Sequence, residues 1–145
     1  MTAEDGGSPA PAGAGPLPRL LCDTAELAEL GAGAPTGALW RLAEPGRQLD
    51  ANVVRLPAAA RVDTHTEPDL DVLLLVLAGG AALVCADGEH PLAPGVLTWL
   101  PHGSTRAVTA GPEGVTYLTV HRRRPGMRIR PPEAADRLRP PGTPV

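Results

Sequence analysis

The sequence predicts an all-β fold of one domain, an antiparallel closed or double-sheet barrel with a short N-terminal helix. Short apolar runs recur at intervals of roughly ten residues between positions 38 and 121, which is the spacing of strands in all-β domains. Glycine and proline turn signals separate most of these runs, and no helical pattern lies between them. Strands that follow one another without intervening helices pair antiparallel, and they favour a barrel or a sandwich.

The two ends of the chain are predicted to lie outside this domain. The chain has 145 residues, which suits one domain, and residues 1–18 are rich in glycine and proline with little to bury. Residues 131–145 form a proline-rich tail of the same character. We therefore expect two disordered tails and a domain over residues 19–130.

A short helix is predicted at about residues 24–30. Asp23 can cap its first turn, Glu26 stands near the position of a capping box, and Gly31 is a C-terminal stop. Its leucines are expected to lie on a neighbouring surface, with the helix acting as a lid, a dimer element or simple packing. These leucines are Leu20, Leu27 and Leu30.

Nine candidate strands follow the helix. They are Ala38–Leu42, Asp50–Leu56, Arg61–Thr64, Val72–Leu77, Ala81–Cys85, His90–Leu92, Val96–Leu100, Thr105–Thr109 and Val115–His121. The run Val72–Leu77 is apolar on both faces, although one face of an antiparallel strand usually meets solvent. We therefore expect its outer face to pack on the helix or on a second subunit, which favours a homodimer.

Composition and charge favour a small molecule or a protein as the partner. The formal net charge is −3 and the pI is near 5.8, so the chain has no general attraction to nucleic acid or anionic lipid. The basic residues 122–124, followed by Arg128 and Arg130, could hold an anion, but an acidic domain with few aromatic residues argues against nucleic-acid binding. The sequence shows no signal peptide and no apolar run long enough for a bilayer, so no membrane contact is expected. Cys22 and Cys85 fit no metal or redox motif and indicate reduced thiols in the cytoplasm.

The stretch Gly95–Arg106 carries the first part of a family resemblance. Gly95, Pro101 and Gly103 match the second motif of the cupin family, which reads Gly, five residues, Pro-x-Gly, two residues, His, three residues, Asn. Arg106 stands at the histidine position of that motif, and Ala110 stands at the asparagine position. Residues 48–121 thus resemble the cupins, which implies a double-sheet jelly-roll barrel.

The first cupin motif is matched less completely. His65 stands at its first histidine and Gly79 at its terminal glycine, whereas Glu67 occupies the second histidine position. Val72 falls where the glutamate is expected, with Asp71 one residue out of register.

The resemblance implies a divalent metal bound by three histidines and a glutamate, with an open coordination position for substrate. In this chain His65, Glu67 and Asp71 could supply a weak site for Fe, Ni, Zn or Mn. Arg106 argues against such a site, because a guanidinium stays charged and has no lone pair to donate. The alternative is that no metal is bound and that Arg106 takes its place.

In the metal-free interpretation Arg106 meets Glu67 or Asp71 inside the barrel, with His65 completing a polar cluster. A buried ion pair of this kind adds little stability, so a barrel that keeps one can be keeping it for a ligand. The plainer interpretation is a solvated pair at the barrel rim. Trp99, directly before the turn, is a further candidate for the ligand site, or a core or interface anchor.

Three functions follow from these residues. The first is binding of a small, anionic metabolite in the barrel. The second is catalysis, by a metal-dependent oxygenase or isomerase, or by a metal-free isomerase or cyclase with His65 as base and Arg106 as electrophile. The third is a dimeric structural or interaction module. Binding is the function that the sequence favours.

Overall fold

The computed structural model describes residues 15–124 of the chain. The predictions made for residues 1–14 and 125–145, Arg128 and Arg130 among them, lie outside the described residues. The elements are α1 (Thr24–Glu29), the 3-10 helix η2 (Gly31–Gly33), β1 (Gly37–Arg41), β2 (Leu49–Leu56), β3 (Arg61–Thr66), β4 (Val72–Cys85), β5 (Gly88–Leu92), β6 (Leu97–Leu100) and β7 (Thr105–Arg122). The predicted all-β fold with one short N-terminal helix is confirmed.

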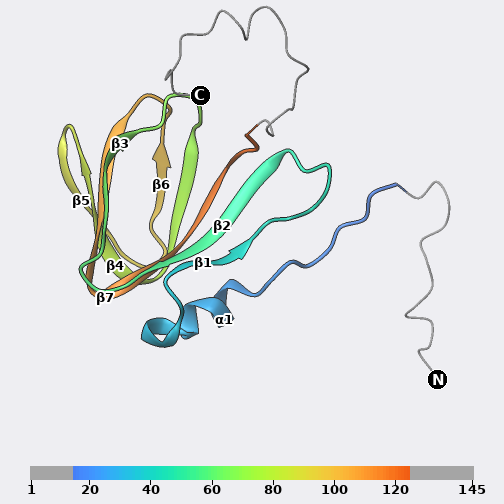
Figure 1. Ribbon diagram of the computed structural model, residues 1–145, viewed down its shortest axis with the longest axis horizontal. Helices are drawn as coiled ribbons and strands as arrows, with labels where there is room; N and C mark the ends of the chain where they lie inside the picture. The colour runs from blue at the N-terminus through green and yellow to red at the C-terminus, as the bar shows by residue number, and fades with distance from the viewer. Residues whose placement is uncertain (1–14, 125–145) are drawn as a thin grey trace, which may run out of the picture.

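All seven strands belong to one antiparallel sheet that folds over into two facing layers (Figure 1). In the first layer, β1, β2, the second half of β7, the first half of β4 and β6 lie side by side. In the second layer, β3, the first half of β7, the second half of β4 and β5 lie side by side. The long strands β4 and β7 run through both layers and hold them together, as in a jelly roll.

Two of the predicted breaks between strands are wrong, because the chain bends there without leaving the sheet. Ala78–Gly80 was expected to be a turn, but β4 continues through it with register shifts on both sides of Gly79, which has φ +74°. Positions 111–114 were also expected to be a turn, but they lie inside β7. Glycine allows the sharp local bend that carries a strand from one layer to the next, and a sequence pattern does not distinguish this bend from a true turn.

The N-terminal helix begins as predicted but covers little of the barrel. The Asp23 carboxylate accepts hydrogen bonds from the backbone N–H groups of Ala25 and Glu26, at 2.9 and 3.4 Å. Leu27 is half-buried, whereas Leu20 is fully exposed and Leu30 is 48% exposed. The expectation that all three leucines pack on a neighbouring surface is therefore wrong for Leu20 and Leu30. The helix leaves much of the outer surface uncovered.

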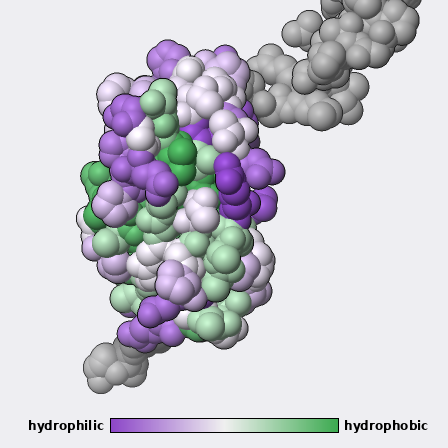
Figure 2. All heavy atoms as spheres, turned by 90° about the vertical axis from the view of Figure 1, so that its left-hand side faces the viewer, coloured by the Kyte–Doolittle hydropathy of each residue, from purple (hydrophilic) through white to green (hydrophobic). Residues whose placement is uncertain are grey.

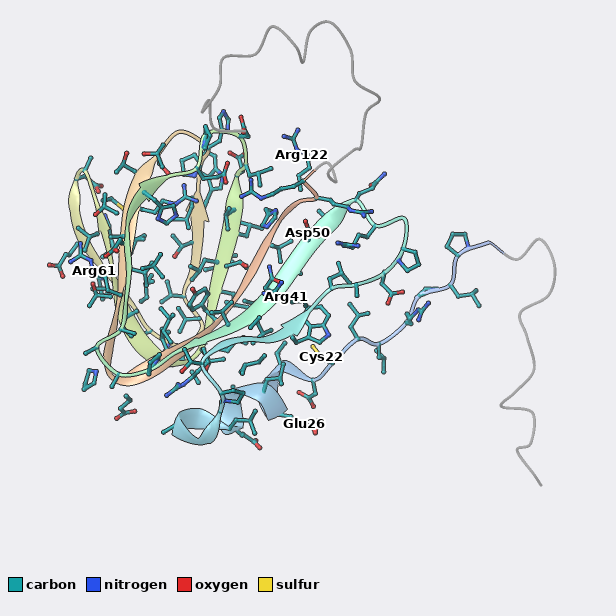
Figure 3. The ribbon with its side chains drawn as sticks, in the orientation of Figure 1. Cys22, Glu26, Arg41, Asp50, Arg61 and Arg122 are labelled. Carbon is teal, nitrogen blue, oxygen red and sulfur yellow. The ribbon has the colours of Figure 1, made fainter. Side chains whose placement is uncertain are left out.

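The core lies between the two layers. The apolar side chains buried there are Leu74, Val76, Leu83, Leu92, Leu100, Val108, Ala110, Val115 and Tyr117. Val72–Leu77 is apolar on both faces as expected, because Leu74 and Val76 point to this core while Leu73 is 45% exposed on the outside. At one end of the barrel the start of β2 runs beside the end of β7, which places Asp50 and Arg122 close together (Figure 3).

The remaining sequence expectations concern the cysteines and membranes. Cys22 and Cys85 are both free, and Cys22 is exposed in the segment before α1 (Figure 3). In residues 15–124 no helix has the length and apolar character needed to cross a bilayer.

Candidate functional site

A cavity of about 240 Å³ opens between the two layers. The charged side chains and histidines that line it are His65, Glu67, Arg106, His121 and Arg124. Apolar residues and Thr119 complete the wall, including Val62, Val72, Leu74, Leu100, Val108 and Tyr117. The structure thus brings together three of the predicted site residues, namely His65, Glu67 and Arg106.

Strand register explains why these side chains share one cavity. His65 of β3 pairs with Arg106 in the first half of β7, and Arg106 pairs in turn with Cys85 of β4. Paired residues point to the same face of a sheet, so this row faces the interior of the barrel. From the opposite layer, alternate residues of β7 reach the cavity, which places His121 there.

Arg106 is buried, with 5% of its surface exposed. Its Nη1 donates to the Ser104 hydroxyl at 3.1 Å and to the Ser104 carbonyl at 3.4 Å. Over residues 15–124 no carboxylate lies within ion-pair distance of this guanidinium. The same residues hold no fully enclosed polar side-chain atom without a partner, so the other Arg106 nitrogens are reached from the cavity.

The Pro-x-Gly turn holds Arg106 in this position through Ser104. The Ser104 hydroxyl donates to the Pro101 carbonyl at 2.7 Å, and its backbone N–H donates to the same carbonyl at 3.1 Å. Gly103, with φ +83°, donates its backbone N–H to the Glu67 carbonyl at 2.7 Å. The turn that carries the family resemblance therefore connects the Arg106 strand to the Glu67 loop.

Glu67 has a different partner from the one expected. Its carboxylate forms an ion pair with Arg124, and its second oxygen accepts from the Asp69 backbone N–H at 2.9 Å. The backbone hydrogen bond from Asp69 and then the Arg124 guanidinium lower the pKa of Glu67 below 4.5. The predicted pair between Glu67 and Arg106 is not formed. The Glu67 carboxylate pairs with Arg124 instead.

Asp71 lies outside the cavity, at the rim of the barrel. Its carboxylate accepts from the His102 backbone N–H at 2.9 Å and contacts His102 Nδ1 at 2.7 Å. These two contacts lower the pKa of Asp71. Asp71 therefore joins two surface loops, whereas the sequence interpretation placed it beside His65 and Glu67.

Both histidines of the cavity are held in a defined tautomer. His65 Nδ1 lies 2.9 Å from the Asp63 carbonyl, and His121 Nδ1 lies 2.7 Å from the Arg122 carbonyl. A carbonyl only accepts hydrogen bonds, so in the neutral ring Nδ1 carries the proton and Nε2 keeps its lone pair. His121 was not assigned to a site from the sequence, and its period-two spacing from Tyr117 and Thr119 is the signal that could have placed it here.

The metal implied by the family resemblance does not fit these residues. His65, Glu67 and Asp71 do not form a cluster: in residues 15–124 the one group of three ligating side chains with donor atoms within 4.8 Å of one another is Cys85, Asp87 and His90. Arg106 occupies a ligand position with a permanent positive charge. Two guanidinium groups, those of Arg106 and Arg124, line the cavity.

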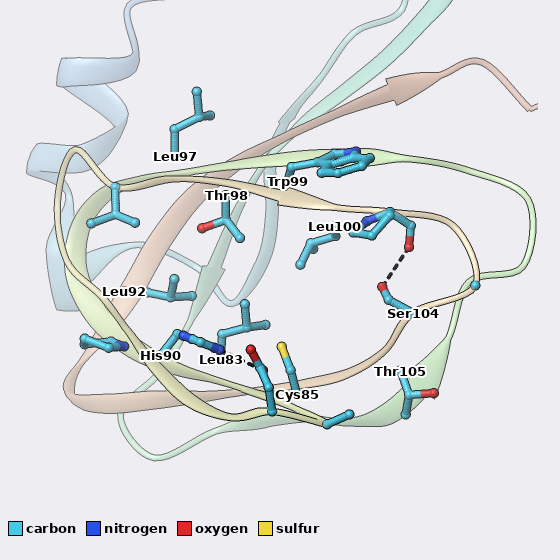
Figure 4. A pocket seen from close by; sticks show the side chains of 16 residues that line it. Leu83, Cys85, His90, Leu92, Leu97, Thr98, Trp99, Leu100, Ser104 and Thr105 are labelled. Atoms are coloured by element: carbon cyan, nitrogen blue, oxygen red, sulfur yellow. Dashed lines mark hydrogen bonds and ion pairs between the residues drawn. The ribbon is translucent and has the colours of Figure 1, made fainter.

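Trp99 lies apart from this cavity. It borders a second and larger pocket of about 820 Å³ between β5 and β6, and 63% of Trp99 is exposed. In Figure 4, Thr98 and Leu100 point into this pocket, while Leu97 points away from it on the other side of β6. Figure 2 shows apolar residues in the middle of the side of the molecule that carries β5, with hydrophilic residues on both sides of them.

No protein-family model matches the sequence, and no curated protein matches it in sequence. Among solved structures, a cupin-2 domain protein from Shewanella frigidimarina superimposes with a TM-score of 0.56 at 16% identity, over 70% of this chain and 94% of that chain. The protein KdgF from Halomonas superimposes with a TM-score of 0.51 at 21% identity, over 59% of this chain and 77% of that chain. This chain is a small cupin-fold protein.

Another cupin is more similar in sequence. A sugar phosphate isomerase of the cupin superfamily from Silicibacter pomeroyi is 30% identical, with a TM-score of 0.51 over 55% of this chain. The present chain spans about half of that isomerase, 53% of its length. These likenesses establish a cupin fold for this chain.

The ion pair of Glu67 leads to a prediction about acid stability. Because its pKa in the folded protein lies below the ordinary value, Glu67 stabilises the fold above pH 4.5, and this contribution is lost as the pH falls through the folded pKa. Glu67→Gln should therefore lower the urea midpoint at neutral pH, and the difference from the unaltered protein should shrink towards zero as the pH falls through the folded pKa of Glu67.

Glu89 offers a matched control for this measurement. It is an exposed glutamate of β5, so Glu89→Gln should leave the urea midpoint unchanged at both pH values. A Glu67→Gln variant whose deficit is the same at neutral and acid pH would show that the ion pair with Arg124 does not contribute.

Proposed function

We propose that this cupin binds a small anionic metabolite in the cavity between its layers, without a metal ion, and that Arg106 is the main contact. The observation that carries this proposal is a buried guanidinium that faces a cavity and has no carboxylate partner among the described residues. Burying a charge without a counterion costs several kcal/mol. An anionic ligand supplies the missing counterion.

The charge and size of the cavity support a ligand of this class. Arg106 and Arg124 contribute two positive charges and Glu67 one negative charge, so these three side chains give the lining an excess positive charge. A volume of about 240 Å³ corresponds to roughly eight water molecules. That space suits a short carboxylic acid or a phosphate group with a small organic part. A guanidinium binds either group through two parallel hydrogen bonds.

Titration of chelator-treated protein with short mono- and dicarboxylates and with inorganic phosphate tests this function. We expect at least one of these anions to bind in a calorimetric titration, and Arg106→Met to weaken that binding by about 100-fold or more. Arg61→Met is the matched control, because Arg61 is exposed on β3 and pairs with Asp63 at 3.6 Å outside the cavity. Binding that survives in Arg106→Met, or no binding of any anion, would contradict the proposal.

Catalysis by the same cavity is a second candidate, and the free Nε2 of His65 favours it. A neutral imidazole within the same row as Arg106 can remove a proton from a bound substrate, while the guanidinium stabilises the negative charge that develops. The similarity to a sugar phosphate isomerase supports an isomerisation of an anionic substrate. His65→Ala should then abolish turnover while anion binding persists. If the unaltered protein binds an anion but does not turn it over, the cavity serves binding and not catalysis.

The apolar outer face of the first layer supports a homodimer. Leu73 of β4 pairs with Trp99 of β6, and Leu75 pairs with Leu97, so all four side chains share one surface beside the free edge of β6. Leu73, Leu97 and Trp99 are 45%, 62% and 63% exposed in the single chain. We propose that a second copy of this chain covers this surface by two-fold symmetry.

Sedimentation of a Trp99→Glu variant tests the dimer. A charge in the centre of the surface should weaken association by at least about 30-fold, because buried tryptophans carry a large share of interface energy. Leu20→Glu is the control, since Leu20 is fully exposed and belongs to neither β4 nor β6, so it should not affect association. A monomeric unaltered protein would refute the dimer proposal.

A further inference from the structure

The hairpin between β4 and β5 carries three side chains with metal-binding atoms. The Cys85 thiol, the Asp87 carboxylate and a ring nitrogen of His90 all lie within 4.8 Å of one another. His90 Nε2 and Asp87 Oδ1 are 3.0 Å apart. None of these residues lines the cavity that contains His65 and Glu67, so the cluster is separate from the site described above.

The backbone of the hairpin brings these atoms together. Cys85 pairs with Gly88 and Leu83 pairs with His90, so Cys85 and His90 are diagonal neighbours on one face of the strand pair. The two residues between Cys85 and Gly88 form the turn, and Gly88 has φ +124°, which favours glycine there. The turn places Asp87 directly over the same face. The donor set therefore results from a tight hairpin and does not depend on a long loop.

The cluster also faces a pocket. Cys85, Asp87 and His90 form part of the wall of the 820 Å³ pocket, opposite strand β6 (Figure 4). Leu83, Leu92, Val96 and Leu100 are among the apolar residues that line the rest of that wall. A polar cluster at the side of a largely apolar pocket is the usual arrangement of a ligand site.

One sulfur, one nitrogen and one oxygen donor form a set that suits a borderline transition metal. Zn²⁺ is bound by cysteine, histidine and carboxylate ligands, whereas Mg²⁺ and Ca²⁺ are bound by oxygen donors. Sites with three protein ligands keep a fourth position for water or substrate. We propose that Cys85, Asp87 and His90 bind one divalent transition metal ion of the Zn²⁺ type, with its remaining coordination position available to a group held in the pocket between β5 and β6.

The charges around the cluster are compatible with this ion. The Cys85 thiolate and the Asp87 carboxylate together neutralise a divalent cation, and the ion takes the place of the proton that His90 and Asp87 share. Burial and then the Asp87 carboxylate raise the pKa of the Cys85 thiol, and the guanidinium of Arg106, which pairs with Cys85 across β4 and β7, acts in the opposite direction. An ordinary ion pair between Asp87 and His90 explains their contact but not the convergence of the thiol on the same point.

Titration of the metal-free protein with Co²⁺ and Zn²⁺ tests the proposal. We expect one equivalent of Co²⁺ to produce a thiolate-to-cobalt charge-transfer absorption, and Zn²⁺ to displace it. Cys85→Ala should abolish this absorption, and His90→Ala and Asp87→Asn should weaken metal binding by about 100-fold and 10-fold respectively. Cys22→Ala, which removes the other thiol of the chain, should change nothing. Circular dichroism of each variant shows whether it is folded.

Elemental analysis after loading separates this site from a metal in the barrel cavity. Retention of one equivalent of metal in His65→Ala, together with its loss in Cys85→Ala, supports the hairpin site and leaves the anion cavity unaffected. Loss in His65→Ala with retention in Cys85→Ala would overturn both the hairpin proposal and the metal-free function. Absence of a bound ion under every loading condition would overturn the hairpin proposal alone.

Discussion

Gly79→Ala is expected to lower the free energy of unfolding by about 2–5 kcal/mol, a large fraction of the roughly 5–15 kcal/mol that stabilises an ordinary protein. A Cβ atom at Gly79 would lie 2.2 Å from the Gly114 carbonyl oxygen and 3.0 Å from its carbon. Both are backbone atoms, so no side chain can move aside. Gly79 also has φ +74°, where an alanine is strained.

Gly80→Ala is the matched control for this prediction. A Cβ atom there would meet its nearest neighbour, the Leu92 carbonyl oxygen, at 3.4 Å, and Gly80 has no positive φ. We expect a change within about 1 kcal/mol in urea denaturation followed by circular dichroism. Equal and small effects of the two substitutions would show that the bend of β4 adapts, and that Gly79 is not required for the two-layer arrangement.

Arg106→Met is expected to abolish anion binding and to leave the fold as stable as before, or more stable by about 1–3 kcal/mol. Methionine fills a similar volume, and it removes a guanidinium that is buried without a carboxylate partner among residues 15–124. The Ser104 hydroxyl loses one donor but keeps its hydrogen bond to the Pro101 carbonyl at 2.7 Å. The opposite signs of the two effects distinguish a ligand-binding arginine from a structural one.

Arg55→Met provides the contrast. Arg55 is also buried, at 4% exposure, but it donates to the Glu113 carbonyl at 2.8 Å and to the Thr116 hydroxyl at 3.5 Å, which ties β2 to β7. Its removal should therefore destabilise the protein. Thermal unfolding and calorimetric titration of both variants provide the comparison, and a large loss of stability in Arg106→Met would contradict its role as a ligand contact.

Local sequence signals predicted most of the fold correctly. The alternation of apolar and polar residues located every strand, and Asp23 predicted the start of α1 because capping depends on a residue and its nearest neighbours. Gly95, Pro101 and Gly103 identified the turn before Arg106, because their backbone restrictions act within a few residues. The sequence interpreted the glycines at the bends of β4 and β7 as turns, since a glycine with positive φ serves a turn and a strand bend equally well.

The composition of the site was decided by tertiary structure. His65, Glu67 and Arg106 were predicted from the sequence and do share a cavity, but Glu67 pairs with Arg124, which is 57 positions away along the chain. Asp71 pairs with His102 from another loop, and His121 enters the cavity through its place in the long strand β7.

Ion pairing and cavity formation depend on which distant segments the fold brings together, and the motif spacings within one segment do not identify its partner segments. The sequence by itself therefore determined the barrel, the Pro-x-Gly turn and the inward position of Arg106. The tertiary structure alone decided that Arg106 has no carboxylate partner among the described residues, because it pairs the Glu67 carboxylate with Arg124.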